Sequence, residues 1–67
     1  MISKNELHPE GKYRISGIGY EMFQKGEIVV FKGKSNALFT FSQGNVEVSI
    51  GESKIEEFLV KLDLESI

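Results

Sequence analysis

Segment 39–50 constrains the fold more than any other part of the chain. Two runs of alternating apolar and polar residues are joined by Gly44-Asn45, a pair that suits a two-residue β-hairpin turn. The register that follows pairs Gln43 with Val46, Phe41 with Val48 and Phe39 with Ile50. A slip of one residue would mix apolar and polar side chains on both faces. The segment therefore predicts a hairpin with one apolar face.

A further strand precedes this hairpin. Residues 27–32 are mostly β-branched or aromatic, and Gly33-Lys-Ser-Asn36 predicts a four-residue turn before Ala37. Pairing Lys32 with Ala37 gives a three-stranded meander over residues 27–50. Its predicted core face consists of Ile28, Val30, Phe39, Phe41, Val48 and Ile50. The same register leaves Val29, Phe31 and Leu38 on the reverse face, where something must cover them.

The two ends of the chain supply the remaining elements. Residues 1–10 are expected to form a flexible N-terminal segment, and 11–67 a single domain that begins with a strand over 11–16, with Tyr13 and Ile15 inward. A long glycine-containing loop follows over 17–26. At the C-terminal end we expect one helical turn at 54–57 and then a short strand. A continuous helix over 54–64 is the alternative, because its apolar residues also have helical spacing.

Length and composition limit what the chain can be. With 67 residues and no cysteine, it has room for one thin core without disulfides, so it folds by packing alone or by burying surface against a partner, including a second copy of itself. It has no apolar run of the ~20 residues that cross a bilayer and no signal-peptide pattern. We therefore expect a cytoplasmic protein with no membrane partner.

Charge is unevenly distributed although the net charge is only −2. Residues 11–44 carry five cations and two acidic residues, whereas 45–67 carry two lysines and six acidic residues. The five cations are Lys12, Arg14, Lys25, Lys32 and Lys34. Together with Tyr20 and Phe23 they offer phosphate attraction and base stacking, which is what single-stranded nucleic acid requires. A nucleic-acid-binding small barrel is thus the alternative function.

Catalysis is not expected. The only histidine is His8, beside Pro9, and no nucleophile, base and orienting group come together in the sequence. We predict no catalytic, cofactor-binding or metal-binding residues and no cofactor.

Four short segments resemble a known group of proteins. They are Gly11-Lys-Tyr-Arg-Ile15, Phe23-Gln-Lys-Gly-Glu-Ile-Val-Val-Phe31, Ala37-Leu-Phe39 and Ile55-Glu-Glu-Phe-Leu59. Together they resemble small, mostly uncharacterised SH3-like barrel proteins of bacteria and their phages. The resemblance implies a mostly β fold: a small SH3-like barrel of four or five antiparallel strands with one short helical turn before the last strand.

A binding module is the function that these observations favour. The resemblance adds the idea of a phage-encoded modulator of a host protein. Proline-rich peptides are not expected ligands, because the chain has no tryptophan. The apolar residues that we predict to contact a protein partner lie in the first loop and behind the meander: Tyr20, Met22, Phe23, Val29, Phe31 and Leu38.

Overall fold

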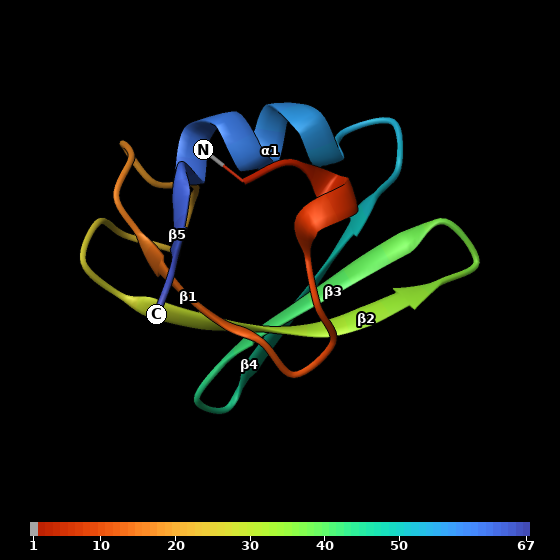
Figure 1. Cartoon of the computed structure of the whole chain (residues 1–67), viewed down its shortest axis with the longest axis horizontal. Helices are drawn as coiled ribbons and strands as arrows, with labels where there is room; N and C mark the ends of the chain where they lie inside the picture. Colours follow the sequence, from red (N-terminus) through yellow and green to blue (C-terminus); the bar gives the residue numbers. More distant parts are fainter. Residues whose placement is uncertain (1) are drawn as a thin grey trace.

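Five antiparallel strands form one sheet, in the order β4-β3-β2-β1-β5, in the computed structural model, which describes residues 2–67. The strands are β1 (Lys12–Ile15), β2 (Ile28–Ser35), β3 (Leu38–Gln43), β4 (Val46–Gly51) and β5 (Leu64–Ser66). A 3-10 turn η1 (Lys4–Glu6) precedes them, and helix α1 (Ile55–Leu62) joins β4 to β5. Figure 1 shows the sheet curling beneath α1. The prediction of a mostly β chain with four or five antiparallel strands is confirmed, and the number is five.

The hairpin of β3 and β4 has the predicted register. Gln43 pairs with Val46, Phe41 with Val48 and Phe39 with Ile50. Phe39, Phe41 and Ile50 are buried, and Val48 packs against the core from a partly buried position. Alternating residues and a Gly-Asn turn were therefore enough to define this part of the sheet.

The register between β2 and β3 differs from the predicted one. Phe31 lies opposite Phe41, and the turn is formed by Asn36 and Ala37 instead of residues 33–36. Both turn residues have positive φ, 52° and 66°, as in the tight turns that match strand twist. A bulge between Phe31 and Gly33 inserts one extra residue. Side chains alternate between the two faces of a strand, so one extra residue reverses the alternation. The β2 residues before the bulge therefore point to the faces opposite to those predicted.

The core face of β2 is consequently the one predicted to lie outside. Val29 and Phe31 are fully buried, whereas Ile28 is 37 % exposed and Val30 is half-buried on the outer face. Val29 and Phe31 belong to one buried cluster with Leu7 of the N-terminal segment and the apolar side of α1. The buried apolar residues form one cluster: Leu7, Tyr13, Ile15, Phe23, Val29, Phe31, Phe39, Phe41, Ile50, Ile55, Phe58, Leu59, Leu62 and Leu64.

Helix α1 is longer than the single turn predicted at 54–57. Ile55, Phe58, Leu59 and Leu62 are buried along one side of it, so helical spacing determines residues 55–62. Asp63 ends the helix in the left-handed conformation, and its backbone N–H donates to the Leu59 carbonyl. A short last strand is present, but only as β5 after the longer helix, where it pairs with β1 through Ile15 and Leu64. The alternative of a helix reaching residue 64 is therefore also wrong at its C-terminal end.

The N-terminal segment packs on the domain. Leu7 belongs to the buried cluster, and Ile2 packs against it. The backbone N–H of Glu10 donates to the Phe31 carbonyl, and that of His8 donates to the Tyr13 hydroxyl. Met1 lies outside the described residues. In the described part of the chain, no helix is long and apolar enough to cross a membrane.

Candidate functional site

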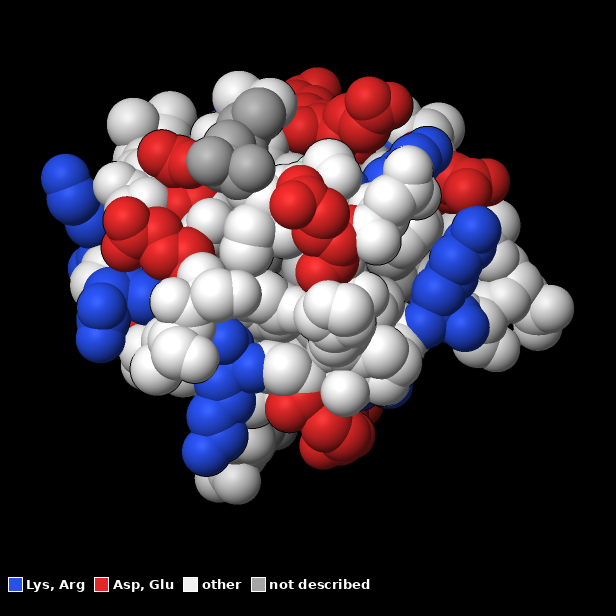
Figure 2. Space-filling view, in the orientation of Figure 1, with Lys and Arg blue, Asp and Glu red and all other residues white. Residues whose placement is uncertain are grey.

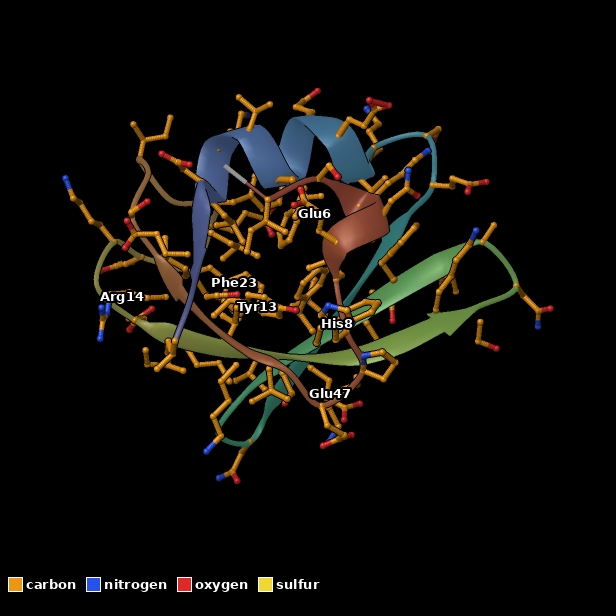
Figure 3. All side chains as sticks on the ribbon, viewed as in Figure 1. Glu6, His8, Tyr13, Arg14, Phe23 and Glu47 are labelled. Carbon is orange, nitrogen blue, oxygen red and sulfur yellow. The ribbon has the colours of Figure 1, made fainter. Side chains whose placement is uncertain are left out.

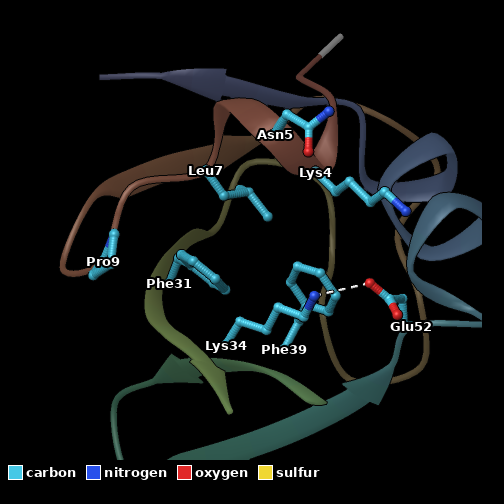
Figure 4. Close-up of a pocket in the computed structure, with 8 residues that line it drawn as sticks. All are labelled: Lys4, Asn5, Leu7, Pro9, Phe31, Lys34, Phe39 and Glu52. Carbon is cyan, nitrogen blue, oxygen red and sulfur yellow. Dashed lines mark hydrogen bonds and ion pairs between the residues drawn. The ribbon is translucent and has the colours of Figure 1, made fainter. Parts of the chain in front are cut away.

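A groove lies between the N-terminal segment and the far end of the β2–β3 hairpin (Figure 4). It has a volume of about 360 Å³. We call it the Phe39 groove, and its lining residues are Lys4, Asn5, Leu7, Pro9, Phe31, Lys34, Phe39 and Glu52. The rings of Phe31 and Phe39 lie 6.1 Å apart between centroids. Leu7, Phe31 and Phe39 thus give the groove an apolar floor.

Charged side chains form its rim. Lys34 pairs with Phe39 across the strands, so its side chain rises on the same face as that ring. Its ammonium nitrogen lies 5.3 Å from the ring centroid and 2.8 Å from a carboxylate oxygen of Glu52. The hydrogen bond from Lys34, followed by the charges of Lys34 and Lys4, lowers the pKa of Glu52. Two lysines therefore act on one carboxylate at this rim.

Contacts with β2 and contacts within the N-terminal segment hold the N-terminal wall of the groove in place. Lys32 forms an ion pair of 3.2 Å with Glu10, next to the backbone bond that joins Glu10 to Phe31. At the start of η1, the backbone N–H of Ser3 donates to the Glu6 carboxylate, and this bond lowers the pKa of Glu6. Leu7 connects these two parts by inserting into the core. The wall can therefore be positioned without a strand pairing of its own.

The loop over residues 17–26, which joins β1 to β2, lines a second and smaller groove. Tyr20 lines it from the loop, Phe58 and Glu57 from α1, and Ile50 from β4, around a volume of about 260 Å³. The Tyr20 ring meets Phe58 edge-on at 5.2 Å, and the Lys61 ammonium lies 5.3 Å from the centre of the Tyr20 ring. These contacts fix Tyr20 as a wall between loop and helix and cover one face of its ring.

Close packing explains two glycines of this loop. A Cβ at Gly17 would collide with the Lys61 carbonyl, and one at Gly19 would lie 2.6 Å from the Phe23 carbonyl. The N–H groups of both glycines donate to carbonyls at the end of α1. The loop is therefore fastened to the helix C-terminus.

The six residues predicted to contact a partner are not brought together. Phe23, Val29 and Phe31 are buried, with exposed fractions of 3 % or less. Figure 3 shows Phe23 inside the molecule, near Tyr13. Met22 is 50 % exposed at the loop tip and Leu38 is 45 % exposed at the end of the β2–β3 hairpin. Of the six, only Phe31 lines the Phe39 groove and only Tyr20 lines the second groove.

The five predicted nucleic-acid-binding cations are also divided: Lys25 is exposed in the loop over 17–26, and the other four are on the sheet. Lys12 and Arg14 project from the outer face of β1, where Lys12 pairs with Val30 and Arg14 with Ile28. Arg14 points away from the core in Figure 3. Lys34 lies on the opposite face, and both Lys32 and Lys34 are in ion pairs. Figure 2 shows acidic side chains over α1 and at several other places on this face, with lysine and arginine mostly toward its edges.

Candidate metal ligands do not cluster in residues 2–67. No three histidine or acidic side chains within this range are placed to hold a metal ion. His8 is exposed and uses its backbone N–H, not its ring, in its hydrogen bond with Tyr13. The Ser49 hydroxyl, which lines the second groove together with Glu57, lies in a 3.1 Å hydrogen bond with the Thr40 hydroxyl.

Comparisons of the chain with models of known protein families, with curated proteins and with solved structures give no match.

Sequence reasoning missed most of the Phe39 groove. Leu7 and Pro9 lie in a segment expected to be outside the domain, and Glu52 lies beyond the last residue of the predicted hairpin. Lys34 was chosen only for its charge. The one available signal was Leu7, an apolar residue outside every predicted strand, which is buried in the structure.

Proposed function

We propose that this chain is a small non-catalytic binding module that recognises a protein partner by taking an apolar side chain of that partner into the Phe39 groove. The observation that carries the proposal is the groove itself, with an apolar floor of Leu7, Phe31 and Phe39 and a rim of charged side chains. Ligand sites are concave, largely apolar and furnished with a few polar groups that orient the ligand. A volume of about 360 Å³ accommodates a short segment of a partner chain.

The arrangement of strands supports a module of the SH3-like barrel type. Three consecutive strands form a meander, β1 joins it through a long loop, and a helical segment leads to a last strand beside β1. This order agrees with the barrel that the sequence resemblance implies. Because such barrels host many kinds of ligand, the fold alone does not select one. The proposal therefore depends on the groove.

Nucleic-acid binding has less support. It needs exposed aromatic rings among the cations, for base stacking. Phe23 is buried, and Tyr20 packs against Phe58 and Lys61. Lys12 and Arg14 remain on the outer face without an ion pair to any residue in 2–67, but their strand neighbours there are Val30 and Ile28. A protein partner is the better match.

Selection of short peptides by phage display, followed by mapping with nuclear magnetic resonance, tests the proposal. The ¹⁵N-labelled domain would be titrated with each selected peptide. We expect the largest amide shifts at Leu7, Lys34, Phe39 and Glu52, with Lys12 and Arg14 unaffected. Val46, exposed at the opposite end of the sheet beside the β3–β4 turn, serves as an apolar internal control.

Two results would overturn the proposal. One is a selection that yields no binding peptide. The other is a set of shifts confined to the outer face of β1 and β2, which would transfer the interface to that face. Sedimentation equilibrium of the free domain tests for the remaining occupant. A mass that rises with concentration, and that Lys34→Glu at the exposed rim reduces, would place a second copy in the groove.

A further inference from the structure

We infer that the Phe39 groove selects a carboxyl-terminal apolar residue of the partner, whose side chain contacts Phe39 and Leu7 while its α-carboxylate pairs with Lys34. This inference rests on the proposed function, since it specifies the chemistry of the segment that enters the same groove. It follows from the position of Lys34, the charge balance at the rim and the size of the groove.

Lys34 links the apolar floor to the charged rim. Its ammonium group is 5.3 Å from the centre of the Phe39 ring, which is 4 % exposed, so a group seated against the exposed edge of this ring also comes within reach of the ammonium. The methylene stem of a lysine adds apolar surface while its charged end stays in water. An apolar side chain and a carboxylate on the same residue match these two features.

Glu52 is a replaceable partner for Lys34. Although their ion pair is short, the two side chains are 46 % and 45 % exposed, and exposed pairs contribute little to stability. Lys4 also lines the groove, and its charge contributes to the lowered pKa of Glu52. Among the lining residues, Lys4 and Lys34 are opposed by Glu52 alone. The rim therefore retains positive charge for an incoming carboxylate.

The size of the groove favours a chain terminus over an internal acidic residue. At about 360 Å³ it lies at the small end of the range for ligand sites. An internal acidic residue next to an apolar one would place two side chains and a continuing backbone in this space. A terminal residue carries its apolar group and its carboxylate together. Capture of a carboxyl terminus is a recurring mode of peptide recognition.

Two small probes separate the carboxylate from the apolar group. N-acetyl-L-leucine carries both groups, and N-acetyl-L-leucinamide has a neutral amide in place of the carboxylate. Both would be titrated into the ¹⁵N-labelled domain at pH 7 in low salt. We expect the acid to bind with a Kd of about 1–10 mM, as its size implies, and the amide about tenfold more weakly, because it lacks a charge-assisted bond.

Variants identify the group that reads the carboxylate. Lys34→Met keeps an apolar stem over Phe39 and should reduce the affinity for the acid to that for the amide. Glu52→Gln removes the competing carboxylate and should raise the affinity for the acid about threefold. Lys12→Met removes the same charge from the outer face and is the matched control, for which we expect no change.

The outcomes distinguish this inference from the proposed function. Equal binding of acid and amide in the groove would overturn selection of a carboxylate and leave an apolar binding groove. Absence of shifts from both probes would overturn the inference, and the display experiment would then decide separately whether longer peptides bind. Binding of the acid that Lys34→Met leaves unchanged would also overturn it.

Discussion

Phe31 lies directly opposite Phe41 across β2 and β3, with 5.2 Å between the ring centroids. This pair fixes which face of β2 enters the core and makes Phe31 both a core residue and part of the groove floor. Leu38, which the sequence places on the same face as Phe31, is instead exposed at the end of the hairpin.

Phe31→Ala should therefore unfold most of the protein. Removal of a buried phenylalanine costs about 3–5 kcal/mol, and a core of this size supplies about the same amount in total. Leu38→Ala is the matched control and should change the free energy of unfolding by less than about 0.5 kcal/mol. Urea denaturation followed by circular dichroism measures both. Equal stability of the two variants would mean that Phe31 is a surface residue.

The bulge and turn of β2 and β3 predict opposite effects for two reciprocal substitutions. Gly33 has φ of 123°, where an added Cβ meets no other atom but the backbone is strained, so Gly33→Ala should destabilise by about 1–3 kcal/mol. Ala37 has φ of 66°, so Ala37→Gly should stabilise by about 0.5–1 kcal/mol, after the entropy cost of glycine. Thermal unfolding measures both. Destabilisation by Ala37→Gly would indicate that the turn lies elsewhere.

The ion pair at the groove rim predicts a specific pH dependence. The hydrogen bond and charge of Lys34 lower the pKa of Glu52, so the pair's contribution to stability is complete above the pKa of a free glutamate. It is lost as the pH falls through the lowered pKa of Glu52. Lys34→Met should raise the pKa of Glu52, measured from the chemical shift of its carboxylate carbon.

Glu27 is the internal control for this titration. Hydrogen bonds from the Gln43 side chain and the Gln24 backbone lower the pKa of Glu27, and neither involves Lys34. Its pKa should therefore stay low in the Lys34→Met variant. If the pKa of Glu52 and the pKa of Glu27 both stay unchanged in the Lys34→Met variant, the ion pair between Lys34 and Glu52 does not form in solution.

The sequence predicted those parts of the fold that depend on local pattern. The β3–β4 hairpin follows from Gly44-Asn45 and strict alternation, and β1 from the inward Tyr13 and Ile15. The β2 register did not follow, because a bulge leaves no clear sequence mark and both faces of residues 28–31 are apolar. Asn36-Ala37 also lacks the glycine that usually marks such a turn.

The candidate site was less predictable than the fold for a related reason. The Phe39 groove combines residues from the N-terminal segment, two strands and the β4–α1 connection, and only the three-dimensional arrangement brings them together. Residues 58–62 are helical instead of extended because four apolar residues of α1 at helical spacing cover the curled sheet. Residues 55–62 show both a helical and a strand-like spacing of apolar residues, and only the packing on the sheet decides between them.

The nucleic-acid alternative makes a prediction of its own. Fluorescence anisotropy with labelled oligo(dT) and oligo(U) at low salt should show no saturable binding, since the stacking rings are not available on the cationic surface. Binding that weakens steeply with salt and is lost in a Lys12→Met, Arg14→Met double variant would establish the alternative.

An isotope-filtered nuclear Overhauser experiment on the labelled domain, with an unlabelled peptide selected by display, locates the peptide on the domain. We predict contacts from an apolar side chain of the peptide to the Phe39 ring and to the Leu7 methyl groups. Contacts confined to Met22, to Leu38 or to the outer face at Ile28 would contradict binding in the Phe39 groove and place the interface elsewhere.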